Sequence, residues 1–346
     1  MDSIMGNNTW VLADLPPCCK PLGCKWIFKR KLKVDGTIEK FKARLVIQGF
    51  KQKLGIDYFD TYAPVVHIST IRLLIAMASI HNLVIHQTDV KTAFLNGDMD
   101  DEAYMNQPQG FIMPGNENKA VSQLEYSKVI GCLMYAMTCT RPGIAFAMGK
   151  LSRYTSNHGT QQWQAIQHVP KYLKKTMDYR LTYTVYPSVL EGYTDASWIS
   201  NTEDNSSTSG WVFLLGGGVI YWASKKQTCI TDSTMEYEFV ALEAADKENE
   251  WLENLLLEIP LWSKPIALIS IHCDSDATLA KAYSQMYNGK SRHLGVRHSM
   301  IHELITNGVV SIEFMRSQQK LADHLTKGLA RDLVIKFAEG MGLKTT

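Results

Sequence analysis

The sequence lacks the features expected of a membrane protein, a zinc-binding protein or a disulfide-rich secreted protein. No stretch contains the roughly 18 consecutive apolar residues that a membrane-spanning helix needs, and the N-terminus has no basic segment followed by an apolar one. The 7 cysteines form no Cys-x-x-Cys pair and no zinc-type spacing with histidine. These absences predict an intracellular chain, cytoplasmic or nuclear, with no membrane partner, and they leave the oligomeric state open.

An excess of one charge is also missing. The 36 Lys and Arg residues against 34 Asp and Glu residues leave a formal charge of +2, which excludes a histone-like polycation. Any contact with nucleic acid must therefore come from local patches. One such patch runs from Lys25 to Lys53, where basic residues alternate with apolar and aromatic ones around an Asp35-Gly36 turn. This pattern predicts a basic β-hairpin, whose charges either bind an anion or are simply solvated.

The length of the chain and the breaks in its hydrophobic periodicity predict that it is divided into several structural segments. A chain of 346 residues with 45% hydrophobic residues can form more than one core. The Pro- and Gly-rich stretch from Pro108 to Gly115 and the polar residues after it break all periodicity. We expect a mixed α/β segment over 1–118, a helical segment over 119–187, a strand-rich domain over 188–335 and a tail over 336–346.

Hydrophobic periodicity predicts the main elements. In the first part we expect a helix over 70–81, a strand over 83–90 and a short helix over 91–97. The middle part is mainly helical, with a bend or interruption at Pro170. In the last part the pattern predicts three antiparallel strands followed by a long helix over 233–258. A buried strand over 266–273, two helices, a strand and a final helix are expected to follow.

Four acidic residues of the last part occupy positions suited to a metal site. Asp195 lies in the first strand, Glu238 in the first turns of the long helix, Asp274 at the end of a strand and Asp323 at the entry to the last helix. Each one alone is more often a cap or turn residue. Together they are the hard oxygen ligands that Mg²⁺ prefers, and two such ions can drive phosphodiester cleavage.

The sequence motifs around these acids resemble those of one protein family. Residues 190–330 resemble the ribonuclease H domain of copia-type retrotransposon polyproteins through GYTDASW, STSGWVF, WASKKQ, STMEYEFVAL, CDSDAT and QKLADHLTKGL. The resemblance implies a mixed five-stranded sheet with flanking helices. It also implies a site in which Asp195, Glu238, Asp274 and Asp323 bind Mg²⁺, with Mn²⁺ as an alternative, and cut the RNA strand of RNA/DNA hybrids. Glu236 is the alternative to Glu238, which we prefer because Phe239 to Ala241 follow the family's pattern.

Some positions depart from the family pattern without removing a ligand. Tyr237 is bulkier than the usual residue between the two glutamates, and Asp276 replaces an amide. The histidine that many cellular ribonucleases H carry before the last aspartate has no counterpart in SQQKLAD. A hybrid duplex exposes 2′-hydroxyls in a wide minor groove, which polar and basic side chains near the site can contact. We name Ser197 and Lys225 as such contacts.

Residues 10–110 resemble the opening of the copia-type reverse transcriptase domain through TWVLADLP, GCKWIFKRK, KARLVIQGF, DYFDTYAPVV and QTDVKTAFLNGDMDDEAYMNQPQGF. The resemblance places the hairpin in the fingers, where Lys29, Arg30, Lys42 and Arg44 contact nucleic acid. It makes Asp89 the first metal-binding carboxylate of the palm. The Tyr-x-Asp-Asp motif that supplies the remaining carboxylates occurs nowhere in the sequence, and the join over 116–123 has the character of an internal deletion.

The leading hypothesis is therefore a retrotransposon-derived chain with a working ribonuclease H domain and a polymerase that has lost activity. A non-catalytic nucleic-acid-binding or decayed retroelement product is the alternative, because a truncated polymerase segment exposes apolar surface. A nuclease or integrase that shares only the fold is less favoured, since the match extends well beyond the acidic residues.

Overall fold

The computed structural model describes residues 21–33, 37–48, 66–88, 124–155, 159–201, 206–262, 264, 266–287, 292–316 and 319–345. The chain divides into two compact units. The first comprises Met1–Val65 with His86–Ala120, and the second comprises Val66–Ile85 with Val121–Thr346. None of the described helices is long and apolar enough to cross a membrane.

The described part of the first unit is a two-stranded antiparallel hairpin, as the alternating pattern predicts. It consists of β1 (Cys24–Leu32) and β2 (Ile38–Ile47), and its Asp35-Gly36 turn lies outside the described residues. The register sets Lys29 opposite Lys42 and Lys31 opposite Lys40. Lys31 is compensated on the hairpin itself, because its Nζ atom lies 3.2 Å from Glu39 Oε2.

The second unit begins with helix α2 (Ile68–Ile80), close to the helix predicted over 70–81. The strand predicted over 83–90 is not formed in its described residues, 83–88, where Val84 and Ile85 are exposed. A strand needs a neighbour for its backbone hydrogen bonds, and none of the described strands pairs with this segment. The strand prediction is wrong for these residues. Positions 89–97, including Asp89, lie outside the described residues.

The helical middle segment packs on itself around a small core. Its elements are α3 (Leu124–Thr140), η3 (Pro142–Ile144), α4 (Ala145–Leu151), η4 (Ser152–Tyr154), α5 (Thr160–Ile166) and α6 (His168–Lys175). The interruption expected at Pro170 comes just after Ile166, because a proline at position 170 cannot donate a hydrogen bond to the carbonyl four residues earlier. Buried Tyr126, Ile130 and Met148 hold these helices together.

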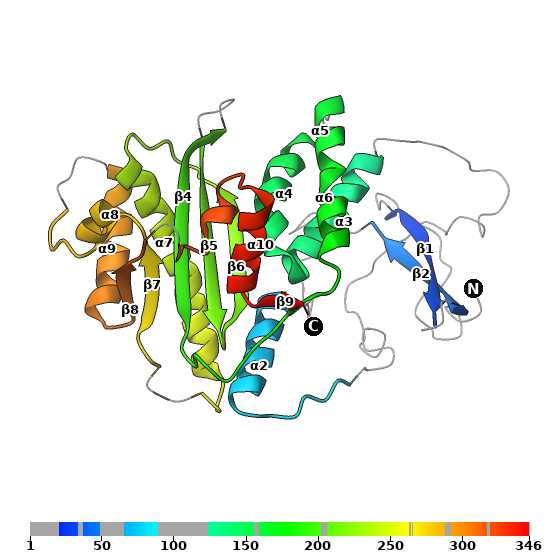
Figure 1. Ribbon diagram of the computed structural model, residues 1–346, viewed down its shortest axis with the longest axis horizontal. Helices are drawn as coiled ribbons and strands as arrows, with labels where there is room; N and C mark the ends of the chain where they lie inside the picture. The colour runs from blue at the N-terminus through cyan, green and yellow to red at the C-terminus, as the bar shows by residue number, and fades with distance from the viewer. Residues whose placement is uncertain are drawn as a thin grey trace. The chain divides into compact units, whose positions relative to one another are not determined.

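A mixed five-stranded sheet forms the centre of the second unit (Figure 1). Its strands are β4 (Glu191–Asn201), β5 (Ser206–Leu215), β6 (Gly218–Lys226), β7 (Ile269–Cys273) and β8 (Val310–Phe314). The order is β6-β5-β4-β7-β8, with β4 antiparallel to β5 and parallel to β7. The predicted strands are thus present, and the chain has the expected mixed α/β architecture.

Helices cover both faces of this sheet, so strand β5 is buried along its whole length. One face packs on α7 (Thr234–Glu258), and α8 (Asp276–Ala282) and α9 (Arg292–Thr306) lie on the same side of the unit (Figure 1). The other face packs on η6 (Asp323–Leu325) and α10 (Arg331–Gly340). The short strands β3 (Tyr179–Leu181) and β9 (Leu343–Thr345) pair separately.

Two regions differ from the predicted division of the chain. Helix α2, expected in the polymerase segment, places Leu73 and Met77 in the core between α7 and the sheet. Arg72 anchors it, because its Nε donates to the carbonyl oxygen of Ile220 at 2.6 Å and its guanidinium lies 3.9 Å from the ring centroid of Trp222. The tail predicted over 336–346 carries the second half of α10 together with β9, and four of its apolar residues are buried: Phe337, Ala338, Met341 and Leu343.

Candidate active site

The central parallel strands bring two of the predicted acids together. Tyr193 of β4 is in register with His272 of β7, so Asp195 and Asp274 each follow their strand's paired residue by two positions. Asp274 directly follows the carboxyl end of β7, and Asp195 lies beside it partway along the longer strand β4. Asp195 is fully buried, whereas the side chain of Asp274 is 16% exposed.

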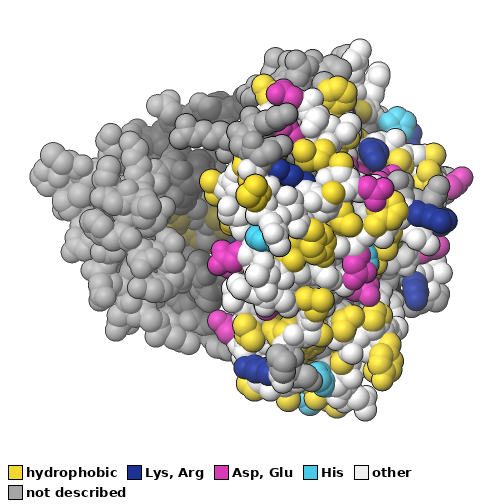
Figure 2. All heavy atoms as spheres, turned by 90° about the vertical axis from the view of Figure 1, so that its left-hand side faces the viewer, with side chains coloured by type: hydrophobic (Ala, Val, Ile, Leu, Met, Phe, Trp, Pro, Cys, Tyr) yellow, Lys and Arg dark blue, Asp and Glu magenta, His cyan; other side chains and the backbone are white. Residues whose placement is uncertain are grey.

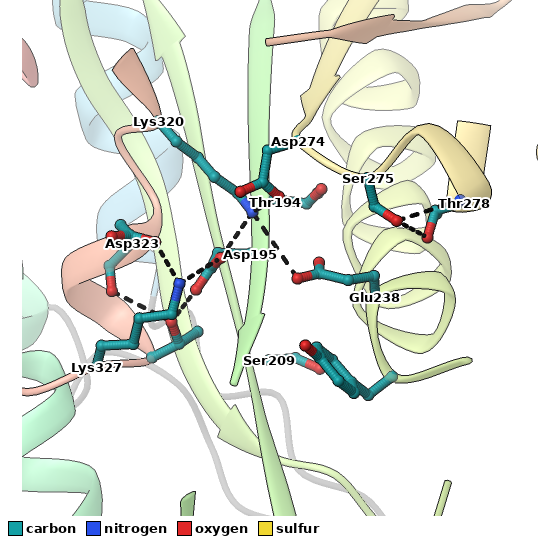
Figure 3. Close-up of polar contacts among 12 residues, drawn as sticks. Thr194, Asp195, Ser209, Glu238, Asp274, Ser275, Thr278, Lys320, Asp323 and Lys327 are labelled. Atoms are coloured by element: carbon teal, nitrogen blue, oxygen red, sulfur yellow. Dashed lines mark hydrogen bonds and ion pairs between the residues drawn. The ribbon is translucent and has the colours of Figure 1, made fainter. Parts of the chain in front are cut away.

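The two glutamates at the start of α7 have different surroundings. Ser233 caps the helix by accepting a hydrogen bond from the Glu236 backbone nitrogen, and the Glu236 carboxylate accepts one from the Asp232 backbone nitrogen at 3.0 Å. Glu236 thus serves the helix end. Glu238 is instead directed at the sheet, toward Asp195 and Asp274 (Figure 3). The geometry favours Glu238 as the member of the acidic cluster.

A lysine lies between these three acids. The Nζ atom of Lys320 is 2.6 Å from Asp195 Oδ1, also contacts Asp274 Oδ1, and is 4.0 Å from Glu238 Oε1. Its side chain is 0% exposed. Figure 3 shows the ammonium directed into the space that the three carboxylates surround. This cation compensates carboxylates whose mutual repulsion would otherwise be costly away from water.

The fourth predicted acid, Asp323, adjoins the cluster through a second lysine. Lys327 Nζ is 2.7 Å from Asp323 Oδ1 and 3.4 Å from Asp195 Oδ1, and the Thr326 hydroxyl donates to Asp195 Oδ2. Asp323 lies in the short 3-10 turn η6, separate from α10, so its predicted place at the entry to the last helix is corrected. All four acids are brought to one region of the molecule (Figure 3).

Burial and charge shift the pKa values of these groups. Burial raises the pKa of Glu238 to about 8, with Lys320 opposing this shift and the neighbouring aspartates adding to it. Burial also raises the pKa of Asp195, against the attraction of Lys320 and Lys327. Burial alone would lower the pKa of Lys320, but Asp195 and Glu238 raise it above its ordinary value. Lys320 therefore stays charged in this site.

The donor set fits a divalent cation of the Mg²⁺ type. The Oε2 atom of Glu238 is buried without a hydrogen-bond partner, and Glu238, Cys273 and Asp274 present ligand atoms within 4.8 Å of one another. Burial raises the pKa of Cys273 to about 11, so this thiol stays protonated and is a poor ligand. The remaining donors are carboxylate oxygens, which Mg²⁺ prefers.

Glycine at position 210 lets η6 approach the acids. Gly210 pairs with Asp195 across the β4-β5 ladder, and a Cβ atom built on it would lie 2.8 Å from both Leu325 Cβ and Thr326 Cγ2. Any larger side chain would push the turn that carries Asp323 and Thr326 away from β4. Gly210, Lys320 and Lys327 were not predicted as site residues, although both lysines flank Asp323 in QKLADHLTK.

The predicted nucleic-acid contacts lie in different places. Lys29, Arg30 and Arg44 are exposed on the hairpin, whereas Lys42 lies in β2 and its side chain is outside the described part. Ser197 is half-buried on β4, two residues after Asp195. Lys225 Nζ contacts Glu248 Oε1 at 3.2 Å and lies 5.1 Å from the ring centroid of Trp211.

A basic groove of about 340 Å³ runs between α4, η4 and β6. Lys225 and Lys226 line it from β6, Lys150 and Arg153 line it from the helical segment, and no acidic residue is among its described lining residues. It adjoins η6, the turn that carries Asp323, because the lining residue Ser224 donates to the carbonyl oxygen of Leu325 at 2.6 Å. The face over α8, α9 and β8 instead carries charges of both signs among hydrophobic side chains (Figure 2).

Comparison with known proteins agrees with these features. Residues 7–153 match the family model of the reverse transcriptase (RNA-dependent DNA polymerase). The chain is 26% identical to the Retrovirus-related Pol polyprotein from transposon TNT 1-94 of Nicotiana tabacum over 96% of its own length and 36% of that protein. It is 24% identical to the corresponding polyprotein from transposon RE2 of Arabidopsis thaliana over 98% of its own length and 33% of that protein. The chain therefore spans about a third of the length of these relatives.

The TNT 1-94 alignment extends over 484 residues, whereas the chain has 346, so the relative contains stretches that this chain lacks. Among solved structures, RNase H1 from the archaeon Halobacterium salinarum NRC-1 is 18% identical, with a TM-score of 0.30 over 40% of this chain and 93% of that one. A score this low does not by itself define a fold.

The central sheet and its flanking helices form a mixed α/β domain, and the chain before it contains most of a segment that matches reverse transcriptase. Over almost its whole length the chain is similar to part of the Pol polyproteins of copia-type retrotransposons.

The fit of η6 against β5 gives a test of the site's geometry. Gly210→Ala is expected to lower the free energy of unfolding by about 1–3 kcal/mol, because the added methyl group overpacks against Leu325 and Thr326. Gly131→Ala in α3 is the matched control, since nothing lies within 4 Å of its new methyl group. It should be neutral or stabilising by up to about 1 kcal/mol. Urea unfolding of both variants measures the difference, and equal effects would contradict the close approach.

Proposed function

We propose that the second unit cleaves the RNA strand of RNA/DNA hybrids with a divalent metal, and that the chain does not polymerise DNA. The observation that carries this proposal is the convergence of Asp195, Glu238 and Asp274 from three elements, with Asp323 adjoining them through Lys327. A buried cluster of acids is costly to stability, so its retention favours a function.

The proposed roles follow from the surroundings of each residue. Asp195, Glu238, Asp274 and Asp323 would hold Mg²⁺ or Mn²⁺, which supplies Lewis acidity and a nucleophilic water when bound. Thr326 and Lys327 orient the Asp195 carboxylate from the η6 side. Gly210 keeps that turn against the sheet. These contacts place the acids on rigid elements, as metal-dependent cleavage requires.

The basic surfaces suit a nucleic-acid substrate. In the groove beside the acids, Lys150, Arg153, Lys225 and Lys226 would contact backbone phosphates, which carry most of the affinity in such complexes. Ser197, two residues from Asp195, would reach a sugar hydroxyl or phosphate of the hybrid. On the hairpin, exposed basic residues line both strands, and basic side chains of this kind suit contact with a phosphate backbone. Lys29, Arg30, Lys42 and Arg44 would accordingly contact nucleic acid.

A labelled RNA/DNA hybrid tests cleavage by the full chain. The full chain is needed because an isolated segment over 188–335 would lose α2 and part of α10, both of which supply core residues. Asp195→Asn and Glu238→Gln are expected to lower the Mg²⁺-dependent cleavage rate by more than about 100-fold, since removal of supporting groups around metal ligands already costs about 10–100-fold.

The matched control for Glu238→Gln is Glu236→Gln, which removes a carboxylate two positions away that caps the helix. It should retain cleavage once its smaller stability is taken into account. Equal activity of wild type and Asp195→Asn, or cleavage in neither, would overturn the proposed hydrolysis. Loss of activity in Glu236→Gln with retention in Glu238→Gln would reverse the assignment of the two glutamates.

Polymerase activity should be absent. Its two-metal chemistry needs carboxylates beyond Asp89, and the sequence contains no Tyr-x-Asp-Asp motif. We expect no primer extension on an RNA template with Mg²⁺ or Mn²⁺. Metal-dependent extension that is lost in Asp89→Asn would show that the remaining carboxylates come from another part of the chain.

Charge reversal tests the groove. The double variant Lys150→Glu with Arg153→Glu should weaken hybrid binding at least ~10-fold and lower the salt slope of the binding constant by roughly 2, one per lost phosphate contact. Lys171→Glu with Lys174→Glu, exposed on α6, makes the same charge change outside the groove and should have a smaller effect. Fluorescence anisotropy at several salt concentrations measures both. Equal weakening by the two double variants would remove the groove from the interface.

One observation favours the second candidate function, nucleic-acid binding without cleavage. Lys320 already compensates the acids, so the cluster is a stable structure without a metal. This alternative would be supported if the chain bound the hybrid but cleaved it neither with Mg²⁺ nor with Mn²⁺.

A further inference from the structure

The position of Lys320 has a consequence for metal binding that goes beyond the role of the acids. Its ammonium contacts Asp195 and Asp274 and faces Glu238, and its side chain is completely buried. These three residues come from β4, the end of β7 and α7, so one cation joins three separate elements (Figure 3).

The ammonium and a divalent ion would use the same oxygen atoms. Mg²⁺ binds carboxylate oxygens at roughly 2.0–2.1 Å, and Lys320 Nζ lies 2.6 Å from Asp195 Oδ1. Two cations sharing one carboxylate oxygen at such distances would repel strongly in a buried site. The lysine and a metal at this position therefore exclude each other.

Lys320 is also close in sequence to the fourth acid, Asp323. It lies three residues before Asp323, and the Asp323 backbone nitrogen donates to the Lys320 carbonyl oxygen at 3.4 Å. Asp323 is meanwhile paired with Lys327. Because Ala322 and Leu325 are buried against the sheet, release of the Lys320 side chain would open the space between the carboxylates while η6 keeps Asp323 beside them.

We propose that Lys320 is a built-in counterion that holds the acidic cluster in the metal-free protein and must leave before the first divalent ion binds. The inference rests on the proposed metal-dependent function of this site. Lys320 thereby weakens metal binding and sets the metal concentration at which the site fills. It also protects the fold without metal, because three buried carboxylates would otherwise face one another without a charge between them.

Metal titration of the full chain tests this competition without measuring activity. Lys320→Met should bind Mg²⁺ and Mn²⁺ at least ~10-fold more tightly than wild type in isothermal titration calorimetry, because no ammonium has to be displaced. In EDTA its melting temperature should fall, and saturating Mn²⁺ should restore it to the wild-type value or above. Lys320→Arg keeps the charge and should keep the weak metal binding of wild type.

Lys247→Met is the matched control, since it also removes a lysine paired with a buried carboxylate, Glu243 at 2.6 Å, but away from the cluster. Its metal affinity should equal that of wild type. An unchanged or weaker affinity in Lys320→Met would overturn the inference, and so would a variant that stays unfolded in saturating Mn²⁺. A gain of one bound ion with unchanged affinity for the first would overturn it too, because Lys320 would then replace a metal rather than compete with it.

The result separates the counterion role from the proposed function. If wild type binds metal and cleaves the hybrid while Lys320→Met binds metal with wild-type affinity, only the counterion role fails. If neither protein binds metal, the metal-dependent function fails and the counterion role fails with it.

Discussion

Charge compensation in a buried space is the constraint on which the rest of this site depends. Asp195, Glu238 and Asp274 come from three elements, and they can share a space away from water only with a cation between them. Lys320 supplies that cation in the structure. Because Lys320 precedes Asp323 in the same segment, the charge that stabilises three acids also fixes the approach of the fourth. The arrangement of the acids and the packing of η6 on the sheet therefore depend on each other.

The sheet converts this charge cluster into a defined geometry. The parallel register of β4 and β7 sets Asp195 beside Asp274, while the antiparallel ladder of β4 and β5 sets Asp195 opposite Gly210. The missing side chain at Gly210 admits η6, whose Thr326 and adjoining Lys327 reach Asp195. Backbone pairing thus positions Asp195 and Asp274. Side chains from the C-terminal part of the sequence, Thr326 and Lys327, complete their surroundings.

Helix α2 links the two parts of the sequence. It comes from the segment that matches reverse transcriptase, yet its apolar face completes the core of the second unit, and Arg72 reaches the edge strand β6 and the end of α3. An amphipathic helix packs where an apolar surface is available, so its membership of a unit follows from contacts distant in sequence. Boundaries drawn from sequence motifs alone would cut through this core.

The sequence by itself determined the elements whose signals are local: the hairpin, the interruption near Pro170, the succession of the central strands along the chain and the four acidic motifs. It did not decide that the segment over 83–88 lacks a strand partner, that residues 336–345 belong to the core, or that Asp323 lies in a separate turn. The family resemblance already favoured Glu238 over Glu236, but only the tertiary structure brought Lys320 between the acids. Periodicity and capping act over a few residues, whereas the partner of a buried charge is chosen by contacts across the whole domain.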